Sequence, residues 1–387
     1  MLVLGSLRDA DGRLASPVVG PVRFAGSALG VVLMGLLCSG CILDLDGLTT
    51  ASQGGQGGEA GQGGQGGGGG GAGGGAGCAV LDCCPAGEII ELARGPEIAD
   101  LPRGIVVGEG GVYWVNLQGN NVVRLAASGG PPEEIAAAVA PRGLALSGQR
   151  LAWTGDDGVS TCSLPACSGD AKVVAPSLAP GSLRSVAFDG ATLVFTDRGV
   201  DIGEGKARSC SADACAPVDL GEGMIAPEGI VIHGGLALWV DQGNGNMNGT
   251  VSRSSKSSAG LTQIAAALLF PTGVAADDTY VYWTEQQEEG HVYRCPYAPG
   301  YCDAPEDIAP AAAPLGRPGD IQIAGGRIYW TNADDGSIRS CPQPGCGGDE
   351  PTVHVTGRQG LTRLAVGSTC LFWTENGGGG AVLKTAR

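Results

Sequence analysis

One short motif recurs along the chain and constrains the fold more than any other feature. It places an aromatic residue after two apolar residues, and it reads VYWVN (112–116), LAWTGD (151–156), LVFTD (193–197), ALWVD (237–241), VYWTE (281–285), IYWTN (328–332) and LFWTE (371–375). Successive copies are 39 to 47 residues apart, and the aromatic position holds all six tryptophans and, in the third copy, Phe195. This period indicates a fold built from repeated units rather than around one irregular core.

Each unit contains four short segments with the composition of β-strands. The first unit reads PRGIVV, VYWVN, VVRLAA and EEIAAAV, separated by turns rich in glycine and proline, and no segment has a helical period. The position twelve residues before the aromatic residue holds Pro102, Pro141, Leu183, Pro227, Pro271, Pro318 and Leu361. We therefore predict an all-β fold, a seven-bladed β-propeller with four antiparallel strands per blade, with a six-bladed propeller as the alternative.

The two ends of the repeat region complement each other. The last unit stops at Arg387 after its third strand, AVLKTAR, and the segment GEIIELARG (87–95) precedes the first unit. Pairing of these two segments would complete the last blade and remove the exposed sheet edges of an open array. We expect a propeller domain over residues 78–387, closed by this N-terminal strand.

The repeat resembles known propeller families. The WT[DEN] element after an aromatic residue resembles the YWTD repeat, and the P-x-G entry to the first strand of each unit resembles NHL and SMP-30-like propellers, over residues 87–387. The resemblance implies that the aromatic residue packs between blades and that the acidic residue after it ties neighbouring blades together. It assigns to the core and the blade contacts Trp114, Trp153, Trp239, Trp283, Trp330, Trp373, Asp197, Asp241, Glu285 and Glu375.

The first 41 residues have the features of an export signal. After Arg23 comes the apolar stretch FAGSALGVVLMGLLCSGC, which is short for a membrane span and ends in small residues and a cysteine. The end of this stretch resembles the lipobox of bacterial lipoproteins, which implies that Cys41 is the lipid anchor. Because Ile42 is not the aspartate that marks inner-membrane retention, we expect the outer membrane. A cleaved signal without lipid, or a single membrane anchor, is the alternative.

A glycine-rich segment separates this signal from the repeats. Of the 71 glycines in the chain, many lie between Gly54 and Gly77, where the sequence has no apolar residues to bury beyond alanine. Such a composition is typical of a flexible linker. We expect residues 42–77 to tether the propeller to the lipid, so that the lipid is its one attachment to the membrane.

The fourteen cysteines predict a disulfide framework in an exported protein. Four pairs recur near the turn between the third and fourth strands of a unit: Cys162 with Cys167, Cys210 with Cys215, Cys295 with Cys302, and Cys341 with Cys346. A bridge from Cys83 or Cys84 to Cys370 would clamp the ring closure, leaving Cys78 to the other cysteine. Zinc is the alternative for the short pairs, but each stands alone without two further ligands.

Composition and motifs exclude several functions. The net charge of −16 argues against nucleic acid as a partner. The three histidines fall in different units, and no nucleophile elbow, HExxH motif or phosphate-binding loop is present. We expect no catalytic residue, metal or cofactor. Calcium is the one ion left open, at the loop carboxylates Asp156, Asp157, Glu288, Glu289, Asp334 and Asp335.

Charged residues mark the expected mouth of the central channel. The residue inside each P-x-G entry is Arg103, Arg142, Arg184 and Glu228 in the first four units. An arc of arginines suits carboxylate or phosphate groups, although these side chains could equally satisfy neighbouring carboxylates. The main hypothesis is a non-enzymatic scaffold that binds an unidentified protein or glycan. The alternative is a lactonase-like hydrolase or lyase that acts on a small anionic substrate at the mouth.

Overall fold

The computed structural model describes residues 80–81, 83–165, 167, 169–177, 179–297, 300–310 and 315–387. The chain divides into two units, Met1–Gln62 and Gly63–Arg387, and every described residue belongs to the second. The predicted signal, the lipid anchor Cys41, the tether and Cys78 lie outside the described residues. Within the described part no helix has the length and hydrophobicity that a membrane span requires.

The second unit consists of seven antiparallel sheets of four strands each. The first four blades are formed by β2 (Pro102–Gly108), β3 (Gly111–Asn116), β4 (Asn121–Ala126) and β5 (Glu133–Ala137); β6 (Leu144–Ser147), β7 (Arg150–Thr154), β8 (Gly158–Ser163) and β9 (Lys172–Pro176); β10 (Leu183–Phe188), β11 (Thr192–Asp197), β12 (Gly205–Ser211) and β13 (Val218–Met224); and β14 (Pro227–His233), β15 (Leu236–Asp241), β16 (Gly249–Ser255) and β17 (Thr262–Leu268).

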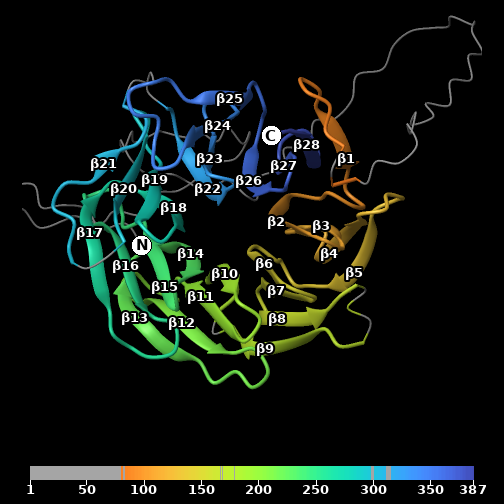
Figure 1. The fold of residues 1–387 in the computed structure, drawn as a ribbon. Helices are drawn as coiled ribbons and strands as arrows, with labels where there is room; N and C mark the ends of the chain where they lie inside the picture. Colours follow the sequence, from red (N-terminus) through yellow and green to blue (C-terminus); the bar gives the residue numbers. More distant parts are fainter. Residues whose placement is uncertain are drawn as a thin grey trace, which may run out of the picture. The chain divides into compact units, whose positions relative to one another are not determined.

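The last three blades are formed by β18 (Pro271–Ala276), β19 (Tyr280–Glu285), β20 (His291–Pro296) and β21 (Glu306–Asp307); β22 (Pro318–Ala324), β23 (Arg327–Asn332), β24 (Ser337–Pro342) and β25 (Thr352–Val355); and β26 (Leu361–Val366), β27 (Cys370–Glu375), β28 (Ala381–Ala386) and β1 (Ile90–Arg94). The first strands of successive blades contact one another in order, and β26 contacts β2 (Figure 1). The fold is therefore a closed seven-bladed β-propeller, which confirms the main prediction and excludes the six-bladed alternative.

The N-terminal strand closes the ring. Strand β1 pairs antiparallel with β28, with Ile90 opposite Lys384 and Arg94 opposite Ala381 (Figure 1). A disulfide joins Cys84 to Cys370 with a Cα–Cα distance of 5.8 Å. The sequence left the partner of Cys370 open between Cys83 and Cys84, and the structure selects Cys84.

Lys384 strengthens the same closure from inside. Its Nζ donates hydrogen bonds to the carbonyl oxygens of Val80 at 2.6 Å and Cys83 at 2.9 Å, so that β28 holds the segment before β1. The residue is almost fully buried, and burial lowers the pKa of its ammonium group. A buried lysine is tolerated here because backbone carbonyl oxygens accept hydrogen bonds from its ammonium group.

The aromatic residues of the repeat form the core between blades, as predicted. All six tryptophans are at most 2% exposed, and Phe195 is 1% exposed. In five blades the aromatic residue is followed by threonine, which adds a contact that the sequence did not reveal. The Thr284 hydroxyl accepts a hydrogen bond from the Gly273 amide at 2.9 Å and donates one to the Gly319 carbonyl of the next blade at 2.6 Å. Thr154, Thr196 and Thr374 make the same bridge.

Two of the acidic residues after the aromatic positions, Asp241 and Glu285, hold the linkers between blades. Asp241 accepts hydrogen bonds from the amides of Ile225 and Ala226, at 3.1 and 2.7 Å, in the linker that enters its blade. Glu285 accepts one from the Leu269 amide at 3.2 Å in the next linker. These side chains therefore join one blade to the chain arriving from the previous blade.

The four short cysteine pairs form disulfides in the structure. The second cysteine of each pair lies in the loop after the third strand, not on the fourth strand, so the bridge folds this loop back. The amides of Cys302 and Cys346 each donate to a carbonyl of the preceding blade, Ile264 and Ile308, both at 2.8 Å. Two of the loops are thereby fixed to the neighbouring blade, so these disulfides support contacts between blades as well as the hairpin within one blade.

Candidate functional site

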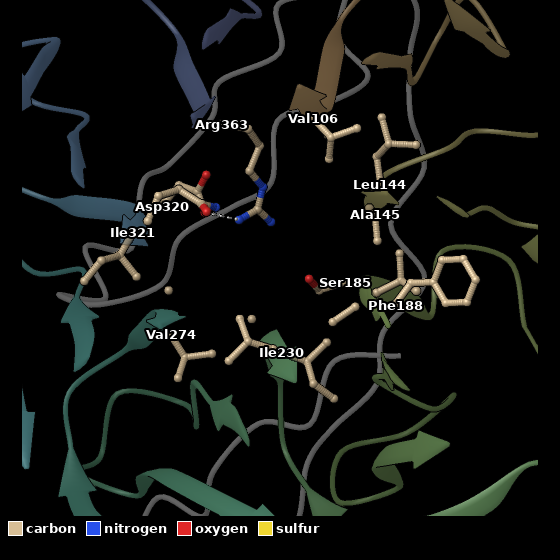
Figure 2. Close-up of a pocket in the computed structure, with 18 of the residues that line it drawn as sticks. Val106, Leu144, Ala145, Ser185, Phe188, Ile230, Val274, Asp320, Ile321 and Arg363 are labelled. Carbon is tan, nitrogen blue, oxygen red and sulfur yellow. Dashed lines mark hydrogen bonds and ion pairs between the residues drawn. The ribbon is translucent and has the colours of Figure 1, made fainter. Parts of the chain in front are cut away.

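A cavity of about 360 Å³ lies on the axis of the propeller and is lined by the first strands of all seven blades. Its walls are mainly aliphatic and include Val106, Ala145, Ile230, Val274 and Ile321 (Figure 2). Its size falls within the range of small-molecule sites, which are mostly apolar with few polar groups. The axial cavity is therefore a candidate ligand site.

The residue that follows the predicted mouth position decides how open the cavity is. It is glycine in four blades: Gly104, Gly143, Gly229 and Gly273. A Cβ at Gly273 would lie 2.5 Å from the Gly319 carbonyl oxygen, and one at Gly104 would lie 2.8 Å from the Leu144 backbone nitrogen. Glycine is needed here because adjacent first strands approach closely at this level.

In the remaining three blades this position carries a polar side chain: Ser185, Asp320 and Arg363. Asp320 and Arg363 come from neighbouring blades, and Figure 2 shows the Arg363 guanidinium extending toward the middle of the cavity while Ser185 lies across from it. The Arg363 Nη1 is 3.4 Å from the Asp320 Oδ1. The other oxygen, Oδ2, accepts a hydrogen bond from the Leu364 amide at 2.8 Å.

The four predicted mouth residues do not line this cavity. Arg142 donates to the Asp156 carboxylate at 2.6 Å and to the Ala140 carbonyl at 3.0 Å. Glu228 forms an ion pair with Arg198. Arg103 and Arg184 are partly buried, and their carbonyl oxygens accept hydrogen bonds from threonine hydroxyls. A ligand-binding role of these four residues stays a prediction.

A bulge at the entry of the first strands explains the displacement. In the first blade the register with the second strand shifts between Pro102 and Ile105, and equivalent shifts occur in five other blades. A bulge re-aims side chains relative to a regular strand. The sequence did carry a signal for the cavity residues, because PGD (318–320) and LTR (361–363) replace the glycine of the P-x-G entry.

The carboxylates considered for calcium are mostly engaged elsewhere. Asp156 accepts from Arg142 and from the Gly181 amide at 2.8 Å. Asp334 and Asp335 form ion pairs with Arg317 and Arg339, each at 2.6 Å. Within the described ranges no three side chains among His, Cys, Asp and Glu gather closely enough to hold a metal ion.

None of the three histidines is among the residues that line the cavity. His291 contacts Asp307 at 2.8 Å within the fifth blade, and His354 contacts Ser340 at 2.8 Å within the sixth. His233 ends β14 and contacts Asp278 at 3.0 Å. Each histidine therefore serves a local contact in its own region of the ring.

The comparison with solved structures supports the class of protein that this ring defines, a β-propeller repeat protein. No family model and no curated protein matches the sequence. Among solved structures, streptogramin B lyase is 14% identical with a TM-score of 0.61 over 78% of this chain and 98% of that one. A catalytically inactive virginiamycin B lyase from Staphylococcus aureus with quinupristin is 13% identical with a TM-score of 0.60, over 78% and 99% of the two chains.

Hydrazine synthase from Kuenenia stuttgartiensis is 14% identical with a TM-score of 0.58, over 77% of this chain and 97% of that one. At these identities the likeness concerns the fold alone. The function has to be argued from this chain's own surface and cavity.

Proposed function

We propose that this chain is a lipid-anchored, non-enzymatic binding protein whose propeller presents one face to a protein partner. The observation that carries the proposal is the position of the exposed apolar side chains. The three most exposed large apolar residues of the described chain are Ile202 (82%), Val200 (70%) and Met247 (59%). All three lie in loops between the second and third strands of two adjacent blades, the third and the fourth.

Antiparallel topology places these loops on a defined face. In each blade the second-to-third-strand loop lies at the same end as the linker that enters the blade, and this is the end where Arg142 and Glu228 stand. Apolar side chains that are exposed together on loops are typical of protein interaction sites. The propeller therefore offers an apolar contact on one face, next to the mouth of the channel.

Both loops are held in shape by their own side chains. In the third blade Glu204 accepts hydrogen bonds from the amides of Val200 and Asp201, at 3.3 and 3.2 Å. In the fourth blade Asn248 accepts one from the Asn244 amide at 3.0 Å. A preorganised loop loses less conformational entropy when it binds, which favours a recognition role.

The chemistry of the loops favours a protein over a glycan. The loop residues 198–204 and 242–248 include no aromatic side chain, and the six tryptophans are buried. Aliphatic side chains and methionine bury well against apolar protein side chains. The expected partner surface is an apolar patch.

The alternative function is a lactonase-like hydrolase or lyase that acts on a small anionic substrate at the channel mouth. Two of its candidate residues, Arg142 and Glu228, are each committed to an ion pair with a neighbouring side chain. Because these two side chains are already paired, they favour a structural role over catalysis at the mouth.

The anchoring part of the proposal is supported by the lipobox-like end of the signal at Cys41 and by the glycine-rich segment that follows.

The test is cross-linking in the native cell envelope, comparing the V200D/I202D double variant with V353D. Val353 is 52% exposed on β25, at the outer edge of another blade, and provides the matched control. We expect one protein to be cross-linked to the wild type and to V353D and to be lost with V200D/I202D. Equal cross-linking in all three proteins would refute the proposed face. Turnover of aliphatic lactones by the purified wild type would support the enzymatic alternative.

A further inference from the structure

We propose that the axial cavity binds a small monocarboxylate with an apolar body, through the guanidinium of Arg363. The inference rests on the cavity and its side chains and is independent of the proposed protein-binding face. The cavity is lined by aliphatic residues from all seven blades, and its polar side chains are few: Ser185, Asp189, Asp320, Gln322 and Arg363. A ligand with an apolar body and one acidic group for Arg363 suits this mixed lining.

The first step concerns how Arg363 is held. Its one ion pair within the described residues is the single contact of 3.4 Å with Asp320. By contrast, Arg358 binds Glu375 through two nitrogens at 2.6 and 3.0 Å. A guanidinium carries five N–H donors arranged as a fork. Arg363 is thus oriented by Asp320 while most of its donors stay available to a ligand.

The second step concerns exposure and place. The Arg363 side chain is 30% exposed and Asp320 is 12% exposed. Figure 2 shows the guanidinium extending into the middle of the cavity, with Ile230 and Val274 on the opposite side. In a site of low polarity a charge-assisted hydrogen bond is stronger than in water. The fork is therefore placed where an acidic group entering the cavity would meet it.

The third step concerns which anion is accepted. Asp320 adds a negative charge beside Arg363, so the pair has no net charge when both groups are ionised. A phosphate dianion would meet repulsion from Asp320, whereas a carboxylate has half that charge and a planar shape that matches the guanidinium fork. Ser185, on the other side of the cavity, can give a further hydrogen bond to a polar group on the ligand.

The fourth step concerns why only this part of the ring is polar. Four blades need glycine at this level because neighbouring strands leave no room for a Cβ, as at Gly143, where it would lie 2.8 Å from the Arg184 carbonyl oxygen. The sixth and seventh blades carry aspartate and arginine at the same level. Apart from Ser185 in the third blade, the other blades have glycine at this level, so both charged side chains lie together on one side of the cavity, as an amphipathic ligand requires.

The experiment is isothermal titration calorimetry on the full-length protein with phenylacetate and hexanoate, and with phenylacetamide as the neutral analogue. We expect both carboxylates to bind one site, and R363Q to weaken them roughly ten- to a hundredfold, the effect of losing charge-assisted hydrogen bonds. R317Q is the matched control, because Arg317 is paired with Asp334 and its side chain is 49% exposed. Binding that is equal in R363Q and wild type would overturn the inference, as would no binding of either carboxylate to the wild type.

Two further variants separate a binding role from a structural one. In D320N the repulsion is removed while the amide oxygen can still accept from Leu364, so we expect tighter phenylacetate binding and new binding of phenyl phosphate. I230F fills the cavity and should abolish the binding of every probe. If D320N weakens phenylacetate as R363Q does, the pair is structural and the inference is wrong. Circular dichroism shows whether each variant is folded. If R363Q does not fold, the phenylacetate affinity of D320N alone tests the inference.

Discussion

Removal of the Cys84–Cys370 disulfide should destabilise the propeller far more than removal of any short bridge. The reason is the length of chain that each bridge closes, 286 residues for Cys84–Cys370 and 5 for Cys210–Cys215. The loop-entropy relation gives about 5–6 kcal/mol for the long loop and about 2 kcal/mol for the short one. The comparison is fair because Cys370 and Cys210 are both buried, and their partners are both partly buried.

The assay is thermal unfolding followed by circular dichroism without reductant, on the double variants C84A/C370A and C210A/C215A. With an unfolding entropy of about 2.1 cal/mol/K per residue, the expected drops in Tm are about 9 °C and about 3 °C. Double variants leave no unpaired thiol from the bridge that was removed. Equal drops in Tm for the two variants would refute the view that the N-terminal strand closes the ring through a long loop.

Three further predictions concern other parts of the chain. C41S should abolish incorporation of labelled palmitate while C38S keeps it, and labelling of C41S would contradict the assignment of the anchor. T284V should lower the free energy of unfolding by roughly 1–3 kcal/mol in urea titrations, because it leaves the Gly273 amide and the Gly319 carbonyl without their partner; an unchanged stability would show that the bridge is dispensable. Burial lowers the pKa of His354 from its ordinary value of 6.5, so the unfolded chain takes up a proton first and stability should fall as the pH drops below about 6.5. H354Q should flatten this part of the stability profile, and an unaltered slope would exclude His354 as its source.

The repeat made the fold predictable because its signals are carried by buried residues at fixed spacing. Trp114 and its equivalents pack between blades whatever the loops contain, so the blade number follows from counting aromatic positions. The closing strand was predictable for a similar reason, since a blade of three strands leaves an unpaired edge. The Cys84–Cys370 bridge then follows from that pairing up to one residue.

The cavity was harder to predict because one residue along a strand changes which way a side chain points. The sequence directs attention to Arg142, which turns to Asp156, whereas the cavity receives Arg363 from a unit in which arginine replaces the glycine of the entry. The bulge between positions such as Leu361 and Leu364 produces this offset. A bulge depends on contacts between strands, and a linear pattern does not report it.

The four short disulfides were predicted, but the threonine bridges and the contacts of the disulfide loops with the neighbouring blade were not, for a related reason. Both depend on groups of a neighbouring blade, as when Cys346 donates its amide to Ile308. Contacts between units require the distance between blades, and this distance is set by the packing of the whole ring. A sequence repeat therefore predicts the structure of one blade more readily than the contacts between two blades.

The closing strand also sets the order in which the molecule can be completed. Chain emerging from its N-terminal end presents β1 and Cys84 first, yet their partners β28 and Cys370 belong to the last blade. The short bridges join cysteines 5 to 7 residues apart and can form as soon as each blade emerges. The ring can therefore be closed only after the last blade has been made.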